Sequence, residues 1–131
     1  MKWKPTAGHL DRVWPRLARI LAKRHQPTRR GRPRDYDDRT YFEALLQYVW
    51  RGLPVRGTLK GNYPAGPVLH RRWKVWRDAG TLKDLTQAYV ASLSKEALSE
   101  WRTLFDGYER GLHGHTRNQP MAWLMVNRFW Y

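Results

Sequence analysis

The chain has 131 residues, enough for one domain or for one domain with an appendage. It contains 25 Lys and Arg against 11 Asp and Glu, a net charge of +14, so we expect a polyanionic partner, most simply nucleic acid. The absence of cysteine excludes a disulfide framework and thiolate chemistry. No apolar run is long enough for a membrane span, and residues 1–5 do not have the apolar core of a secretory signal.

The first predicted helix covers residues 9–23, where apolar side chains recur at helical spacing. Asp11 is the expected N-cap, which places Pro15 at the edge of the first turn.

Residues 24–35 form a basic arm in which prolines and a glycine favour an extended chain over a helix. Its core, Arg30-Gly31-Arg32-Pro33, resembles the AT-hook, a peptide that lies in the minor groove of A·T-rich DNA. Glycine allows a close approach to the groove floor, and arginines suit its negative potential. The alternative is a basic, disordered linker. The candidate DNA contacts of the arm are Arg29, Arg30, Gly31, Arg32, Pro33 and Arg34.

The clearest helix is predicted over residues 35–52, capped by Asp37 or Asp38 and closed by Gly52. Its broad apolar stripe predicts the central helix of the core. A turn with a short helix is expected over residues 53–59, and a loop over residues 60–64.

The following helix, within residues 64–80, has two different faces. Pro67 suits its start and Gly80 the position just past its end. One face carries Leu69, Trp73 and Trp76, widened by Val68 and Val75. The opposite face carries His70, Arg71, Lys74 and Arg77. This order of helix, turn and cationic helix is typical of a helix-turn-helix, which places its second helix in the DNA major groove. The alternative is a solvated cationic surface helix.

Two more helices are predicted toward the C-terminus, one entered through a capping box at residues 81–84 and the next running from Ser94 to Gly107. As a helical hairpin they suit packing or self-association. His113 and His115 have no third ligand nearby, so we expect no metal site. The apolar tail, residues 121–131, either packs back on the domain or docks on a partner.

The ordered set of motifs between residues 10 and 85 resembles the N-terminal DNA-binding domain of bacterial insertion-sequence transposases of the insertion-sequence-five group. The resemblance implies binding to transposon-end DNA. In that family a separate downstream domain carries the catalytic carboxylates, so we expect no enzymatic activity and no cofactor here. The landmarks are Leu10-Asp11, Trp14, Arg30-Gly31-Arg32-Pro33-Arg34, Asp38-Arg39, Ala44-Leu45, Tyr48-Val49, Arg51-Gly52-Leu53-Pro54, Leu59, Arg71-Arg72-Trp73, Trp76, Ala79-Gly80 and Leu85.

The sequence thus predicts an all-α protein: a helix-turn-helix bundle over residues 1–80 with the basic arm, and a helical extension with an apolar tail over residues 81–131. The expected function is sequence- or shape-selective binding of double-stranded DNA by a transposase-derived protein of the bacterial cytoplasm and nucleoid. Two alternatives stay open: a structural RNA-binding component, and a regulatory partner of a transposase that acts through residues 81–131.

Overall fold

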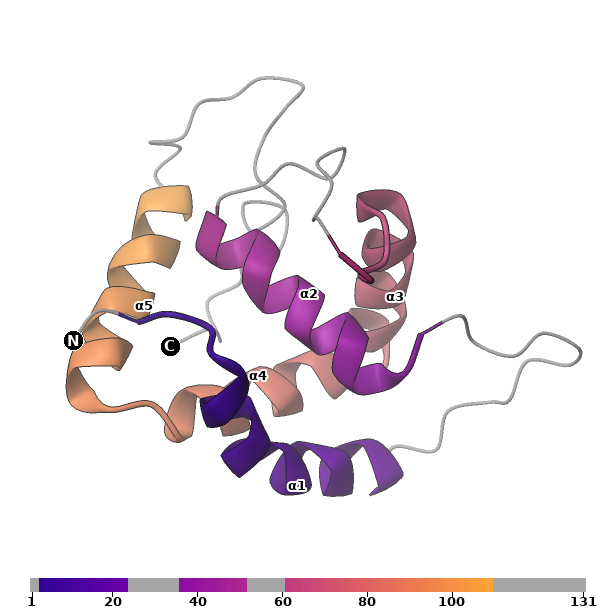
Figure 1. Ribbon diagram of the computed structural model, residues 1–131, viewed down its shortest axis with the longest axis horizontal. Coiled ribbons are helices and arrows are strands. Elements are labelled where there is room, and N and C mark those ends of the chain that lie inside the picture. The colour runs from indigo at the N-terminus through magenta and orange to yellow at the C-terminus, as the bar shows by residue number, and fades with distance from the viewer. Residues whose placement is uncertain (1–2, 24–35, 52–60, 110–131) are drawn as a thin grey trace, which may run out of the picture.

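The computed structural model describes residues 3–23, 36–51 and 61–109. Within these ranges it contains five helices and no strand, which confirms the all-α class. The helices are α1 (Ala7–Lys23), α2 (Asp38–Arg51), α3 (Gly66–Asp78), α4 (Thr81–Ala91) and α5 (Lys95–Glu109). In the view of Figure 1, α2 crosses the middle, with α1 below it and α3 and α5 to its two sides. None of these helices is long and apolar enough to cross a membrane.

Helix α1 begins earlier than predicted, because Thr6 caps it. The Thr6 hydroxyl accepts a hydrogen bond from the His9 amide at 3.3 Å, so the predicted Asp11 cap is wrong. The Asp11 carboxylate instead pairs with Arg39 on α2. Pro15 therefore lies inside the helix, on its exposed side. There the carbonyl that loses its amide partner can turn to water.

Helix α2 is the central core helix, as predicted. Asp37 is its N-cap: the carboxylate accepts a hydrogen bond from the Thr40 amide at 2.7 Å. A side-chain hydrogen bond from Thr40, followed by this backbone bond, lowers the pKa of Asp37. Its buried residues are Tyr41, Phe42, Ala44, Leu45, Leu46, Tyr48 and Val49. Gly52 and the short helix expected over residues 53–59 lie outside the described residues.

Helix α3 buries the predicted face, since Leu69, Trp73 and Trp76 are each at most 2% exposed. Val75 does not widen that face: it is 46% exposed, because helical geometry places it about 125° from the centre of the buried stripe. The helix ends in a turn where Gly80 has a φ of 78°, the left-handed conformation that the sequence predicts.

Helices α4 and α5 begin differently from each other. The predicted capping box at the start of α4 is wrong, because the buried Thr81 hydroxyl has no hydrogen-bond partner and Gly80 occupies the cap position. Ser94 does cap α5, and its hydroxyl accepts from the Ala97 amide at 3.2 Å. Helix α5 continues through Gly107 to Glu109, so the predicted end at Gly107 is also wrong. One glycine weakens a helix by only about 1 kcal/mol and need not end it.

A single cluster of buried side chains joins all five helices and the segment before α1. Helix α4 packs on both α1 and α3, and meets α5 through Tyr89 and Trp101, whose ring centroids are 5.8 Å apart. The predicted hairpin is open, because α5 rises away from the end of α4 (Figure 1). Side chains from both sides of residue 80 share this core. The domain boundary expected at residue 80 stays a prediction.

Candidate nucleic-acid interface

The cationic side chains predicted on α3 lie on its solvent side. Arg71, Lys74 and Arg77 are exposed, and His70 is half-buried. The opposite side of the same helix is fixed in the core by Leu69, Trp73 and Trp76. The helix therefore presents its cations from a rigid base, which is the arrangement needed to hold side chains at a fixed depth in a groove.

Two of the four candidate side chains on α3 are supported by the ring of Trp73. The His70 ring stacks on it, with centroids 5.1 Å apart and an interplanar angle of 18°. From the same helix, the Arg77 guanidinium carbon lies 4.8 Å from the Trp73 ring, a cation–π contact. All four side chains were predicted on the side opposite the apolar face. Arg71 and Lys74 lie there, whereas His70 and Arg77 lie at the border of the buried face, against Trp73.

The side chains of this face differ in their charge state and in their partners. Partial burial, followed by the charges of Lys74 and Arg77, lowers the pKa of His70 below its ordinary value of 6.5. At neutral pH His70 is thus an uncharged donor and acceptor, suited to the edge of a base. Arg77 Nε lies 3.1 Å from the Asp78 carboxylate, an exposed ion pair that a competing anion can replace.

Arg72 is a residue of this helix that the sequence analysis did not single out as a site residue. Its guanidinium carbon lies 5.0 Å from the centre of the Tyr41 ring on α2. This cation–π contact joins α3 to the central helix and helps to set the angle at which α3 is held. The sequence position of Arg72 could have indicated this contact. At about 100° per residue, Arg72 falls beside the buried stripe of α3 and not on its outer face.

Several residues on which predictions were made lie outside the described residues. These are the candidate DNA contacts Arg29, Arg30, Gly31, Arg32, Pro33 and Arg34 of the arm, the histidines at positions 113 and 115, where no metal site is expected, and the apolar tail over residues 121–131. What was expected of each stays a prediction. Among the residues that are described, no group of three or more His, Asp or Glu is placed to hold a metal ion.

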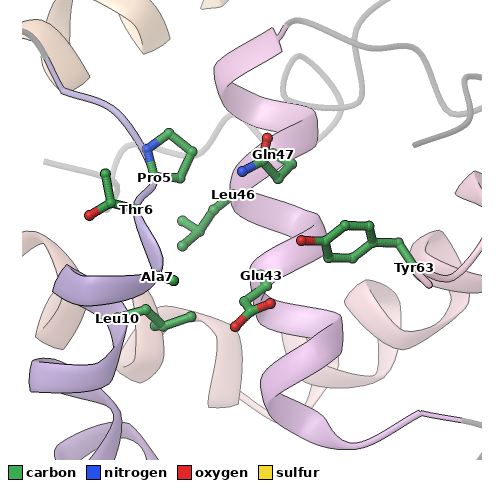
Figure 2. A pocket seen from close by; sticks show the side chains of 8 residues that line it. All are labelled: Pro5, Thr6, Ala7, Leu10, Glu43, Leu46, Gln47 and Tyr63. Atoms are coloured by element: carbon green, nitrogen blue, oxygen red, sulfur yellow. The ribbon is translucent and has the colours of Figure 1, made fainter. Parts of the chain in front are cut away.

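A small hollow between the segment before α1 and helix α2 has a structural role (Figure 2). Glu43 is the one carboxylate among its lining residues, and its Oε1 accepts a hydrogen bond from Arg39 Nε at 3.0 Å. Because Arg39 also pairs with Asp11 on α1, the three side chains join α1 to α2. The other polar side chains that line this hollow are those of Thr6, Gln47 and Tyr63.

Comparison with known families matches residues 10–86 to "Putative transposase of IS4/5 family (DUF4096)". The chain belongs to this transposase family. The predicted resemblance to insertion-sequence transposases is therefore confirmed. The comparisons with curated proteins and with solved structures gave no match.

The transposase match contains nearly all of α1, the basic arm, α2, α3 and the first half of α4. All ten candidate contact residues lie inside it. Helix α5 and the buried Trp3 lie outside it, yet both pack into the same core as the matched helices. The transposase-family segment is thus completed by residues on either side of the match.

Proposed function

We propose that this transposase-family protein binds double-stranded DNA and inserts the exposed face of α3 into the major groove. The observation that carries the proposal is the two-sided helix itself: Arg71 and Lys74 are exposed, while Trp73 and Trp76 on the other side are almost fully buried. A helix fits the major groove of B-DNA, and a net charge of +14 favours approach to the phosphates.

Each side chain of the face receives a role from its chemistry. An arginine can donate two hydrogen bonds to guanine O6 and N7, worth roughly 1–3 kcal/mol of discrimination, and we assign this role to Arg71. Neutral His70 and Lys74 flank it at the base edges. Arg77 lies at the border of the face. There a DNA phosphate can replace the Asp78 carboxylate as its anionic partner, so that Arg77 keeps one charged hydrogen-bond acceptor.

The basic arm, residues 24–35, is the part of the protein that we assign to the minor groove. Arg30 and Arg32 enter the groove beside the α3 site, as arms of homeodomain type do. The biological role is binding or regulation at transposon ends in the bacterial nucleoid, with no nuclease chemistry in residues 1–131.

The test starts with a competition between duplex DNA and structured RNA of equal length for the full chain, at about 150 mM salt, where non-specific phosphate binding is weakened. Duplex preference supports the proposal, and RNA preference overturns it in favour of a ribonucleoprotein component. Selection from a randomised duplex pool follows. A recovered motif with a guanine-containing core beside an A·T-rich flank is the expected result. Retained binding without any enrichment would make the protein a sequence-blind nucleic-acid packager.

A further inference from the structure

Helix α1 carries a line of four exposed cations that the proposed function does not use. Arg12, Arg16, Arg19 and Lys23 follow one another at intervals of four, three and four residues, and all four are exposed. At about 100° per residue they fall within an arc of about 60°, and at 1.5 Å per residue the line is about 16 Å long. We call this line the α1 stripe.

No acidic side chain of α1 interrupts the stripe. Asp11, the one acid of this helix, points about 100° away from the stripe and pairs with Arg39. In the part of the chain that the structure describes, none of the four cations forms an ion pair. Like charges three and four residues apart on a helix repel one another, and a bound polyanion offsets this repulsion.

The other side of α1 decides which kind of polyanion fits. Leu10, Val13 and Leu17 are at most 6% exposed, since they pack into the core. An amphipathic helix that binds a membrane needs its apolar side for the lipid, and here that side is already occupied. The stripe therefore offers charge without an apolar face, which suits a phosphodiester backbone in water better than a bilayer.

The surface beside the α1 stripe is hollowed widely enough for a phosphodiester backbone to lie along it. A wide hollow runs between α1 and α4, with Arg16, Arg19 and Lys23 on the α1 side. The α4 side contributes one carboxylate, Asp84, and the exposed amide of Gln87, so cations outnumber acids along it. Ile20, Ala88 and Ala91 provide the apolar part of its lining. In sequence, Lys23 is followed directly by the basic arm, so positive charge continues from the stripe toward the proposed minor-groove contact.

We propose that the α1 stripe is a second DNA contact, which binds the phosphodiester backbone of the duplex independently of its sequence. This inference rests on the proposed function of α3. Duplex DNA carries one charge per roughly 1.7 Å of its axis, so a stripe of this length faces several phosphates. In this proposal α3 selects the DNA sequence, and the α1 stripe adds affinity that depends on salt and not on sequence.

The test compares two double variants of the full chain that lose the same charge. Arg16→Gln with Arg19→Gln alters the stripe, and Lys95→Gln with Arg102→Gln removes two exposed cations of α5 as the matched control. Affinity for one duplex is measured from about 50 to 300 mM salt. Each lost phosphate contact lowers the slope of log affinity against log salt by about 0.9. We expect a decrease of about 1.8 for the stripe variant, with unchanged base preference, and no change for the control.

The outcomes separate the two proposals. If the wild-type chain does not bind duplex DNA, the proposed function fails and this inference with it. If Arg71→Ala changes base preference while the stripe variant keeps the wild-type salt slope, only the inference about α1 is overturned. Vesicles of phosphatidylserine and phosphatidylcholine are the second probe. Loss of vesicle binding in the stripe variant with undiminished duplex binding would likewise overturn it. Circular dichroism of both double variants checks that the helices are retained.

Discussion

The indole Nε1 of Trp3 donates a buried hydrogen bond to the hydroxyl of Tyr89 at 2.9 Å, although the two residues are 86 positions apart in the chain. The Trp3 ring also meets the Trp101 ring edge to face, with centroids 4.8 Å apart. The bond thus fixes the segment before α1 against α4 and α5. Because α4 packs on α3, this distant contact supports the helix that we propose to enter DNA.

Removal of the phenol oxygen tests how much this bond contributes. Tyr89→Phe leaves the buried indole N–H of Trp3 without its acceptor, so we expect the free energy of unfolding to fall by about 1–3 kcal/mol in urea denaturation. Tyr36→Phe is the control, since the Tyr36 hydroxyl makes only a long bond of 3.4 Å to the Tyr63 carbonyl in a half-buried place. Equal losses in the two variants would contradict a special role for the Trp3–Tyr89 bond.

The same tyrosine predicts a dependence of stability on alkaline pH. Burial raises the pKa of Tyr89 to about 12, from an ordinary value near 10. Between these values the folded chain holds the proton more tightly than the unfolded chain. The contribution is therefore complete below pH 10 and declines as pH rises toward 12, by about 2–3 kcal/mol at most. Tyr89→Phe should lose less stability than the wild type over this interval, as measured by denaturation at each pH. Parallel curves for the two proteins would contradict this assignment.

Much of the helical core was predictable because it depends on local spacing. The apolar stripes of α2 and α3 and the left-handed Gly80 follow from periodicity and from the conformational freedom of glycine alone. The Asp37 cap follows from the preference of short polar side chains for that position. In each case the residues that define the feature lie within one or two turns of one another.

The remaining features depend on contacts between distant residues. Trp3 lies in a short segment without periodicity, and only its partners Tyr89 and Trp101 explain its burial. Asp11 has the side chain of a cap, but its pairing with Arg39 on α2 cannot be read from local sequence. At the proposed site, the cations of α3 could be predicted, whereas the support of His70 and Arg77 by Trp73 required the fold.

Replacement by alanine should change stability differently at two prolines, because one lies inside a helix and the other in a first helical turn. Pro15 lies inside α1, where it removes one helical hydrogen bond, so Pro15→Ala should stabilise the protein by about 1–3 kcal/mol. Pro67 lies in the first turn of α3, where no hydrogen bond is lost. Pro67→Ala should therefore be neutral, or destabilise by up to about 1 kcal/mol through the unfolded chain. Thermal unfolding of both variants tests the pair, and destabilisation by Pro15→Ala would contradict the interior position of Pro15.

Protonation of His70 should strengthen DNA binding. Its lowered pKa keeps it neutral at pH 7, where we assign it to a base edge, and it gains a positive charge within the negative potential of the groove only at lower pH. We expect affinity to rise up to about tenfold between pH 7 and pH 5.5, because a cation is added to the DNA-binding face. His70→Gln should remove that rise, while His9→Gln, which alters the histidine held by Ser92 on another surface, should keep it. The unfolded chain binds this proton more tightly, so the contribution of His70 to stability falls as pH drops below 6.5.

A rise of equal size in wild type and His70→Gln would assign the pH dependence to another group. Binding is measured by fluorescence anisotropy with one duplex at fixed salt, because a change in ionic strength would itself alter the affinity.

If α3 selects DNA sequence through its exposed face, the base preference of the protein must change in Arg71→Ala. The wild type, Arg71→Ala and the control Arg102→Ala are each selected against the same randomised duplex pool. We predict that Arg71→Ala loses roughly 1–3 kcal/mol of discrimination at one guanine-containing base pair and keeps the wild-type preference elsewhere, while Arg102→Ala matches the wild type. A uniform loss of affinity for all sequences in Arg71→Ala, with every base preference intact, would contradict sequence selection by α3.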